Sequence, residues 1–256
     1  MAEFDRDRDA VMVRAREARV KLIVNAGRHL ASSRESVLLA ERYPEIYAAV
    51  GFHPHDAAAM KETDLAHLEN LTHSPKVVAL GEMGLDFFRN RSPREVQMAV
   101  FEKQLHLASQ CRLPVIVHSR QAHQETLDIL TRWRSDWGDV SQAPGVMHCF
   151  SGDAPQATTY LELGFYLSFA GSITYGERLN AEAIELVPRE RLLVETDSPF
   201  LTPQPYRNRR NEPSHVRQVI EKIAEIRGLP PEQVGLETAA NTARLFRLPS
   251  PEDTPQ

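Results

Sequence analysis

The sequence has few cysteines, and none are paired in a metal-binding spacing. Only Cys111 and Cys149 occur among its 256 residues. Two isolated cysteines form neither the C-x-x-C pairs of a structural zinc site nor the disulfide framework of a small secreted domain. Both lie among apolar neighbours, so we expect buried thiols without a disulfide. A reducing compartment, the cytoplasm, is the predicted location.

Long apolar runs and an excess of positive charge are also missing. No run approaches the ~18 residues that a membrane span needs, and the N-terminal segment MAEFDRDRDAVMVRAREA is too charged for a signal peptide. The sequence therefore predicts no membrane partner. The formal net charge is -5, which excludes a strongly basic coat. Contact with nucleic acid would have to be local or bridged by metal.

Short apolar strands alternate with amphipathic helical segments along the chain. Continuous apolar strands of this kind predict a parallel sheet covered by helices. With no linker near the midpoint, we predict an α/β fold, a TIM-type (β/α) barrel forming one domain over residues 1–248, with a disordered tail at 249–256. Seven strands are predicted, at residues 20–26, 46–52, 76–82, 113–119, 144–150, 164–170 and 191–197.

The beginning of the chain departs from a complete eight-stranded barrel. Such a barrel opens on a strand, whereas this sequence opens on a helical pattern with Arg14, Arg16 and Glu17 at its polar positions. The strand missing from the count of eight is therefore the first.

Five predicted strands end in a histidine or a carboxylate. Because the carboxyl ends of parallel barrel strands meet at the active-site mouth, we expect these side chains to converge. Imidazole suits zinc and carboxylates suit magnesium or manganese, so the set predicts a site for divalent metal ions. Such an ion activates water and polarises a phosphoryl or carbonyl oxygen. The five residues are His53, Glu82, His118, His148 and Asp197.

The segment KVVALGEMGLDF places Glu82 between Gly81 and Gly84. Glycines remove side-chain bulk, so we expect a sharp turn of the backbone and room for a metal or substrate. Glu82 is the predicted central ligand, able to bridge two ions. His55 and His123 lie near this site in the sequence and are weaker candidates.

Basic residues supply candidates for substrate binding. Arg120 follows His118 in VIVHSR, and the segment YRNRRNEPSHV offers Arg207, Arg209 and Arg210 to phosphate oxygens. A solvated charged loop explains any single arginine of that segment nearly as well, and both interpretations stay open.

Five segments together resemble the motifs of the TatD family of metal-dependent deoxyribonucleases, within the amidohydrolase superfamily. They are AAVGFHPHDA, VVALGEMGLDF, LPVIVHSRQAHQETLDIL, GVMHCFSG and RLLVETDSPFL, with YRNRRNEP and NTARLF near the C-terminus. The resemblance implies a TIM-type barrel that hydrolyses DNA phosphodiester bonds with one or two divalent ions. It implies that Glu82 is shared by both metals and that His118 and His148 complete one site. Asp197 would serve the other site and help to activate water, and His53 would touch substrate.

The sequence departs from this family at its start. The family opens on a D-T/S-H-x-H strand whose two histidines bind the second metal, and no H-x-H occurs near the start here. We therefore expect the first strand to be absent, a natural start upstream of Met1, and at most one well-bound metal, unless His53 or His55 replaces the lost ligands. A lesser departure is Asn208, where the family often has glycine.

Two other functions remain open from the sequence. The same site could hydrolyse another ester or amide, such as a lactone or an aminoacyl ester on tRNA. Alternatively, the missing H-x-H favours a catalytically weakened relic that binds nucleic acid or a protein partner without turnover.

Overall fold

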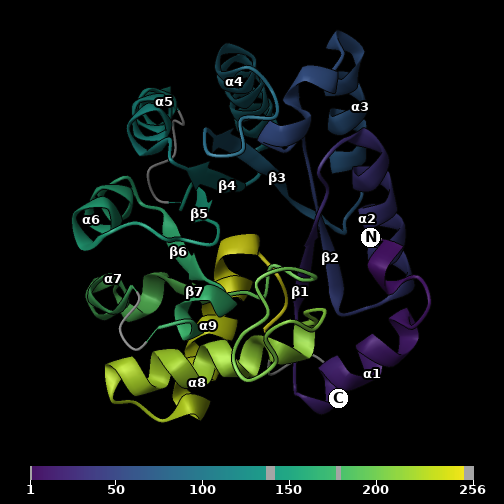
Figure 1. The fold of residues 1–256 in the computed structure, drawn as a ribbon. Coiled ribbons are helices and arrows are strands. Elements are labelled where there is room, and N and C mark those ends of the chain that lie inside the picture. Colours follow the sequence, from purple (N-terminus) through teal and green to yellow (C-terminus); the bar gives the residue numbers. More distant parts are fainter. Residues whose placement is uncertain (1, 137–141, 177–179, 251–256) are drawn as a thin grey trace. The chain divides into compact units, whose positions relative to one another are not determined.

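The computed structural model describes residues 2–136, 142–176 and 180–250. Strands and helices alternate along these residues, as Figure 1 shows. The chain divides into two compact units. The β1–β5 unit comprises Ile23–His148 with Glu162–Phe165, and the β6–β7 unit comprises Met1–Leu22, Cys149–Leu161 and Tyr166–Gln256. The assignment of residues 1–248 to a single domain stays a prediction.

The β1–β5 unit is a parallel sheet whose strands lie in chain order. A helix follows each of the first four strands, so each crossover returns the chain to the same end of the sheet. The strands are β1 (Ile23–Ala26), β2 (Ile46–Val50), β3 (Val77–Asp86), β4 (Val115–Arg120) and β5 (Gly145–Met147). The helices are α2 (Leu30–Arg42), η2 (Pro54–Ala59), α3 (Glu62–Thr72), α4 (Arg94–Cys111) and α5 (His123–Asp136).

The β6–β7 unit contains the N-terminal helix and the C-terminal third of the chain. Its two strands, β6 (Tyr166–Phe169) and β7 (Leu192–Val194), also pair in parallel. Its helices are η1 (Ala2–Phe4), α1 (Arg8–Glu17), α6 (Ala154–Glu162, whose last residue falls in the other unit), η3 (Gly171–Thr174), α7 (Ala181–Leu186), η4 (Arg189–Arg191), η5 (Pro213–His215), α8 (Val216–Arg227) and α9 (Pro231–Phe246).

All seven predicted strands are present in the described residues, and helices, η1 and α1, precede the first strand as predicted. Their apolar side chains are buried in the sheet; Leu80, Met83 and Val117 are completely inaccessible to solvent. The predicted end of β3 at residue 82 is wrong, because the strand continues to Asp86. Hydrophobicity alone marks the end of the apolar run, whereas β3 keeps pairing with β4 beyond it.

Three further predictions concern membrane-spanning helices, the two cysteines and the C-terminal tail. No helix in the described residues is long and apolar enough to cross a bilayer. Neither cysteine forms a disulfide, but both are only half-buried, because Cys111 is the last residue of α4 and Cys149 follows the end of β5. Most of the predicted tail, residues 251–256, lies outside the described residues.

Candidate metal centre

Glu82 lies on a bulge in β3. Leu80 pairs with Val115 and Met83 with Val117, so β3 advances three residues where β4 advances two. One extra residue in a strand breaks the regular alternation of side chains and re-aims them, a device common beside active sites. This local irregularity, rather than the end of the strand, presents the Glu82 carboxylate.

The glycines around Glu82 allow β3 and β4 to approach closely. Both have positive φ, +141° at Gly81 and +137° at Gly84. A Cβ on Gly84 would lie 2.0 Å from the carbonyl oxygen of His118, and one on Gly81 would lie 2.7 Å from that of Ile116. The close approach of the β4 backbone accounts for glycine at these two positions, and the expectation that they leave room for a metal stays a prediction.

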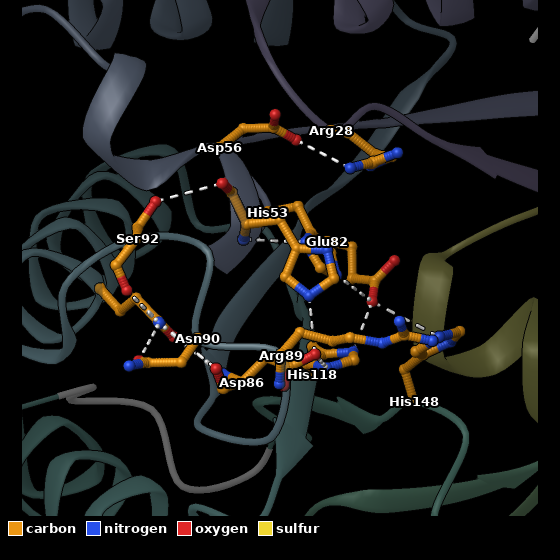
Figure 2. A network of polar contacts seen from close by, with 12 residues as sticks. Arg28, His53, Asp56, Glu82, Asp86, Arg89, Asn90, Ser92, His118 and His148 are labelled. Atoms are coloured by element: carbon orange, nitrogen blue, oxygen red, sulfur yellow. Dashed lines mark hydrogen bonds and ion pairs between the residues drawn. The ribbon is translucent and has the colours of Figure 1, made fainter.

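Three imidazoles surround one oxygen of Glu82, as Figure 2 shows. Its Oε1 lies 2.9 Å from His118 Nδ1, 3.4 Å from His53 Nε2 and 3.5 Å from His148 Nε2. Ligand atoms of His53, Glu82 and His118 all lie within 4.8 Å of one another. Of the five side chains expected to converge, four lie together here, and they come from three neighbouring strands and the loop after β2.

His53 is oriented by its own backbone. It caps η2, and its Nδ1 accepts a hydrogen bond from the backbone N–H of His55 at 3.1 Å. A neutral imidazole that accepts at one nitrogen carries its proton on the other. The Nε2–H of His53 is then directed at Glu82, which makes His53 a hydrogen-bond donor in this arrangement even though its distance would suit a ligand.

Burial and neighbouring charges together set the pKa values of the residues in this cluster. Burial alone would raise the pKa of Glu82, but His148, His118 and His53 hold that pKa well below its ordinary value. Burial opposes protonation of His118, yet the neighbouring carboxylates of Asp86 and Glu82 outweigh it and raise the His118 pKa. Burial lowers the pKa of His53. Glu82 is therefore ionised and His53 neutral at pH 7, the forms that can serve a metal centre.

Asp86 belongs to this site and was not predicted from the sequence. It is completely buried, and its Oδ2 lies 2.7 Å from His55 Nε2 and 3.5 Å from His118 Nε2. Its Oδ1 accepts a hydrogen bond from the backbone N–H of Arg89 at 2.7 Å. Its place in the motif GLDF gives a usable signal, because residues four apart on a strand lie on the same face, here that of Glu82.

The donor set fits a divalent metal ion. His118 Nε2 is buried and has no hydrogen bond in the described part of the chain. A buried nitrogen in that state costs roughly 1–3 kcal/mol, and coordination would remove the cost. One carboxylate with several imidazoles suits zinc, manganese or a similar ion. Ligand atoms of His53, Glu82 and His118 lie together in a group that could hold such an ion, and the role of His148 as a ligand stays a prediction.

Two predicted site residues lie in the β6–β7 unit. Asp197 follows β7 with a positive φ of 54°, and its carbonyl accepts from the backbone N–H of Phe200. Its membership of a common metal centre with Glu82 stays a prediction. Arg207 lies with its guanidinium 3.7 Å from the centre of the Tyr175 ring, so its charge is already stacked on an aromatic face.

One arginine of the basic segment has a structural role. Arg210 forms two hydrogen bonds of 2.6–2.7 Å to Glu3 and Asp7 through Nη1 and a third of 2.7 Å to Asp7 through Nη2. Next to it, the Glu212 carboxylate accepts hydrogen bonds from Arg14 Nε at 2.8 Å and from Arg14 Nη2 at 2.7 Å. These bonds fasten α1 to the loop before α8, so Arg210 is engaged in the fold and is not available to phosphate.

The family description TatD-related DNase matches residues 1–247. The chain belongs to this family. It is 41% identical over 247 residues to the uncharacterized metal-dependent hydrolase YabD of Bacillus subtilis, covering 96% of this chain and 95% of that protein. It is 38% identical over 257 residues to the 3'-5' ssDNA/RNA exonuclease TatD of Erwinia billingiae, covering 97% of this chain and 96% of that protein.

Solved structures agree with this assignment. The TatD homologue YJJV from Escherichia coli K12 has a TM-score of 0.89 and 31% identity, over 97% of this chain and 95% of that one. A TatD-family hydrolase of Entamoeba histolytica has a TM-score of 0.82 over 94% of this chain and 89% of that one. Its 22% identity supports the fold alone. The predicted α/β barrel-type fold is confirmed, and this TatD protein is a metal-dependent hydrolase.

Proposed function

We propose that this TatD protein hydrolyses phosphodiester bonds in single-stranded DNA, or in RNA, with the help of a divalent metal ion. The observation that carries the proposal is the ionised Glu82 carboxylate within 3.5 Å of three imidazoles. The name of the Erwinia relative, a 3'-5' ssDNA/RNA exonuclease, supports the choice of substrate and of digestion from the 3' end. A cytoplasmic location remains part of the proposal.

Glu82, His118 and His148 would hold the ion, which supplies a polarised phosphoryl oxygen and a more acidic water when bound. Other side chains of the protein are proposed to contact the substrate and to help activate water. His53 lies beside Glu82 and is the proposed substrate contact. The exposed guanidinium of Arg120 can neutralise phosphate charge. Asp197 remains the proposed partner in activating water.

We propose one tightly bound metal ion in the 256-residue chain. In the described residues, one group of three or more potential ligand atoms lies together, and it surrounds Glu82. Elemental mass spectrometry of the purified protein tests this stoichiometry directly. A measured content of two tightly held ions would contradict it and would make His53 or His55 the next ligand to test.

The activity is tested with a fluorescent single-stranded oligonucleotide, with Mg²⁺, Mn²⁺ or Zn²⁺ added to chelator-treated protein. We expect metal-dependent shortening of the strand by wild type and a loss of ~10²-fold or more in rate for Glu82→Gln. Glu62→Gln, an exposed glutamate on α3, is the matched control. Absence of cleavage, combined with turnover of a lactone or an aminoacyl ester, would replace the proposal by the other ester hydrolase activity.

A further inference from the structure

The turn after β3 exposes an aromatic ring beside the candidate metal centre. Phe87 and Phe88 are neighbours, yet Phe87 is buried at 8% exposure while half of Phe88, 50%, is accessible. Phe88 is thus one of few large apolar side chains left in solvent, and the only aromatic so exposed in the described part of the β1–β5 unit. Packing does not account for it.

A cation lies on this ring. The guanidinium carbon of Arg120 is 4.1 Å from the centre of Phe88, and that of Arg89 is 5.8 Å away. Arg120 is exposed at the end of β4. It is two residues beyond His118, so its Cα lies ~7 Å further along the same strand. The ring and the guanidinium therefore meet close to the metal-binding end of β4.

The segment that carries Phe88 is strongly basic within an acidic protein. Residues 87–94, FFRNRSPR, include Arg89, Arg91 and Arg94 and no acidic residue, whereas the whole chain has a net charge of -5. All three arginines are exposed. Such a local concentration of positive charge beside an exposed aromatic is the pattern of single-strand binding grooves, in which bases stack and phosphates are neutralised.

Hydrogen bonds through Asp86 connect the turn after β3 to the candidate metal centre. Asp86 accepts the backbone N–H of Arg89 through one oxygen and contacts His55 and His118 through the other. The backbone N–H of Phe87 also donates to the carbonyl of Arg120 at 3.0 Å. On the other side, the Gln97 side chain bonds both the N–H and the C=O of Asp86. Phe88 is therefore held at a set position relative to Glu82.

We propose that Phe88 and Arg120 form a nucleotide platform, in which the ring stacks on an unpaired base next to the cleaved bond and the guanidinium binds its phosphate. The proposal rests on the proposed nuclease function and adds the feature that selects single strands, since a base inside a duplex cannot stack on the ring. Stacking requires only a π-face, so the platform accepts all four bases.

The kinetic test compares Phe88→Ala and Phe88→Trp on two substrates. One is a single-stranded oligonucleotide, and the other has abasic residues at its 3' end. We expect Phe88→Ala to raise KM for the normal oligonucleotide about 10-fold, Phe88→Trp to retain the wild-type KM, and neither to change KM for the abasic one. An unchanged KM for Phe88→Ala, or an equal rise on both substrates, would overturn the platform.

Two controls separate stacking from general damage. Tyr47 carries Lys76 4.4 Å above its ring at the amino ends of β2 and β3, away from the metal-binding ends, so Tyr47→Ala should leave KM unchanged. Arg120→Gln should reduce the slope of log KM against log salt by about 0.7, the value for one phosphate contact on a single strand. An unchanged slope would remove Arg120 from the platform.

A binding measurement keeps the inference testable if no cleavage is found. The indole introduced by Phe88→Trp reports base stacking through fluorescence quenching. Quenching by the normal oligonucleotide, and not by a fully abasic one, would support the platform even where the nuclease proposal fails. Equal signals from both oligonucleotides would refute the platform whether or not the protein is a nuclease.

Discussion

Asp86→Asn is the change that tests most directly how the metal centre is held in place. The variant keeps the size of the side chain and can still accept the Arg89 N–H through its amide oxygen. It removes the negative charge and turns an N–H₂ group toward His55 Nε2 at 2.7 Å and His118 Nε2 at 3.5 Å. The substitution therefore alters the support of the ligands without altering Glu82.

The expected magnitudes follow from these contacts. Loss of a partner that orients metal ligands typically costs 10- to 100-fold in metal affinity, and we expect a weakening of about 30-fold. Hydrogen bonds to charged groups contribute ~1.5–3 kcal/mol. Losing one of them at this fully buried position lowers Tm by about 3–12 °C, at roughly 2–4 °C for each kcal/mol in a chain of this size.

The protonation of His118 provides a second measurement. Because the Asp86 carboxylate, 3.5 Å from His118 Nε2, helps to raise the pKa of His118 against the effect of burial, the His118 pKa of the metal-free variant should be lower than that of wild type. Titration by NMR of the imidazole resonances gives this value, and isothermal calorimetry gives the metal affinity. Asp64→Asn, which replaces another buried aspartate at the start of α3, should lower Tm only. Wild-type metal affinity together with an unchanged His118 pKa would refute the reasoning.

Three further predictions concern the same residues and the N-terminal helix. Glu82→Gln should reduce bound metal at least 10-fold, measured by mass spectrometry on folded protein; full metal content would contradict its central position. His148→Ala should weaken metal affinity more than His53→Ala, because His53 Nδ1 accepts a backbone N–H and its Nε2 carries the proton; calorimetry showing the reverse order would make His53 the ligand. The Arg14 hydrogen bond lowers the pKa of Glu212, so its stabilisation is present above pH ~4.5 and is lost as pH falls through the folded pKa; acid denaturation should show this loss in wild type and not in Glu212→Gln.

The strands were predictable because their signal is local. Each buried parallel strand needs a continuous apolar run, and the chain contains seven such runs bounded by polar residues. The convergence of Glu82, His118 and His148 follows from the same principle, since parallel strands present their carboxyl ends at one edge. The parallel order of β1 to β5 then brings together three side chains that are 36 and 30 residues apart in the sequence.

The rest of the site depends on contacts that no local pattern records. The bulge at Glu82 is visible only against the register of β4, and the need for glycine at position 84 comes from the His118 carbonyl. Sequence patterns alone do not single out Asp86, because a polar residue beyond an apolar run is typical of the beginning of a loop. It is part of the strand, buried by its neighbours and satisfied by His55 and the Arg89 backbone.

The Asp86 carboxylate contacts both the metal cluster and the turn that carries Phe88. Its Oδ2 faces two imidazoles of the metal cluster, and its Oδ1 closes the turn that presents Phe88. A fully buried charge is expensive unless all its lone pairs are used, and here the partners come from both structures. An ion at Glu82 and a base on Phe88 would therefore be held by groups that share one rigid support, all within the β1–β5 unit.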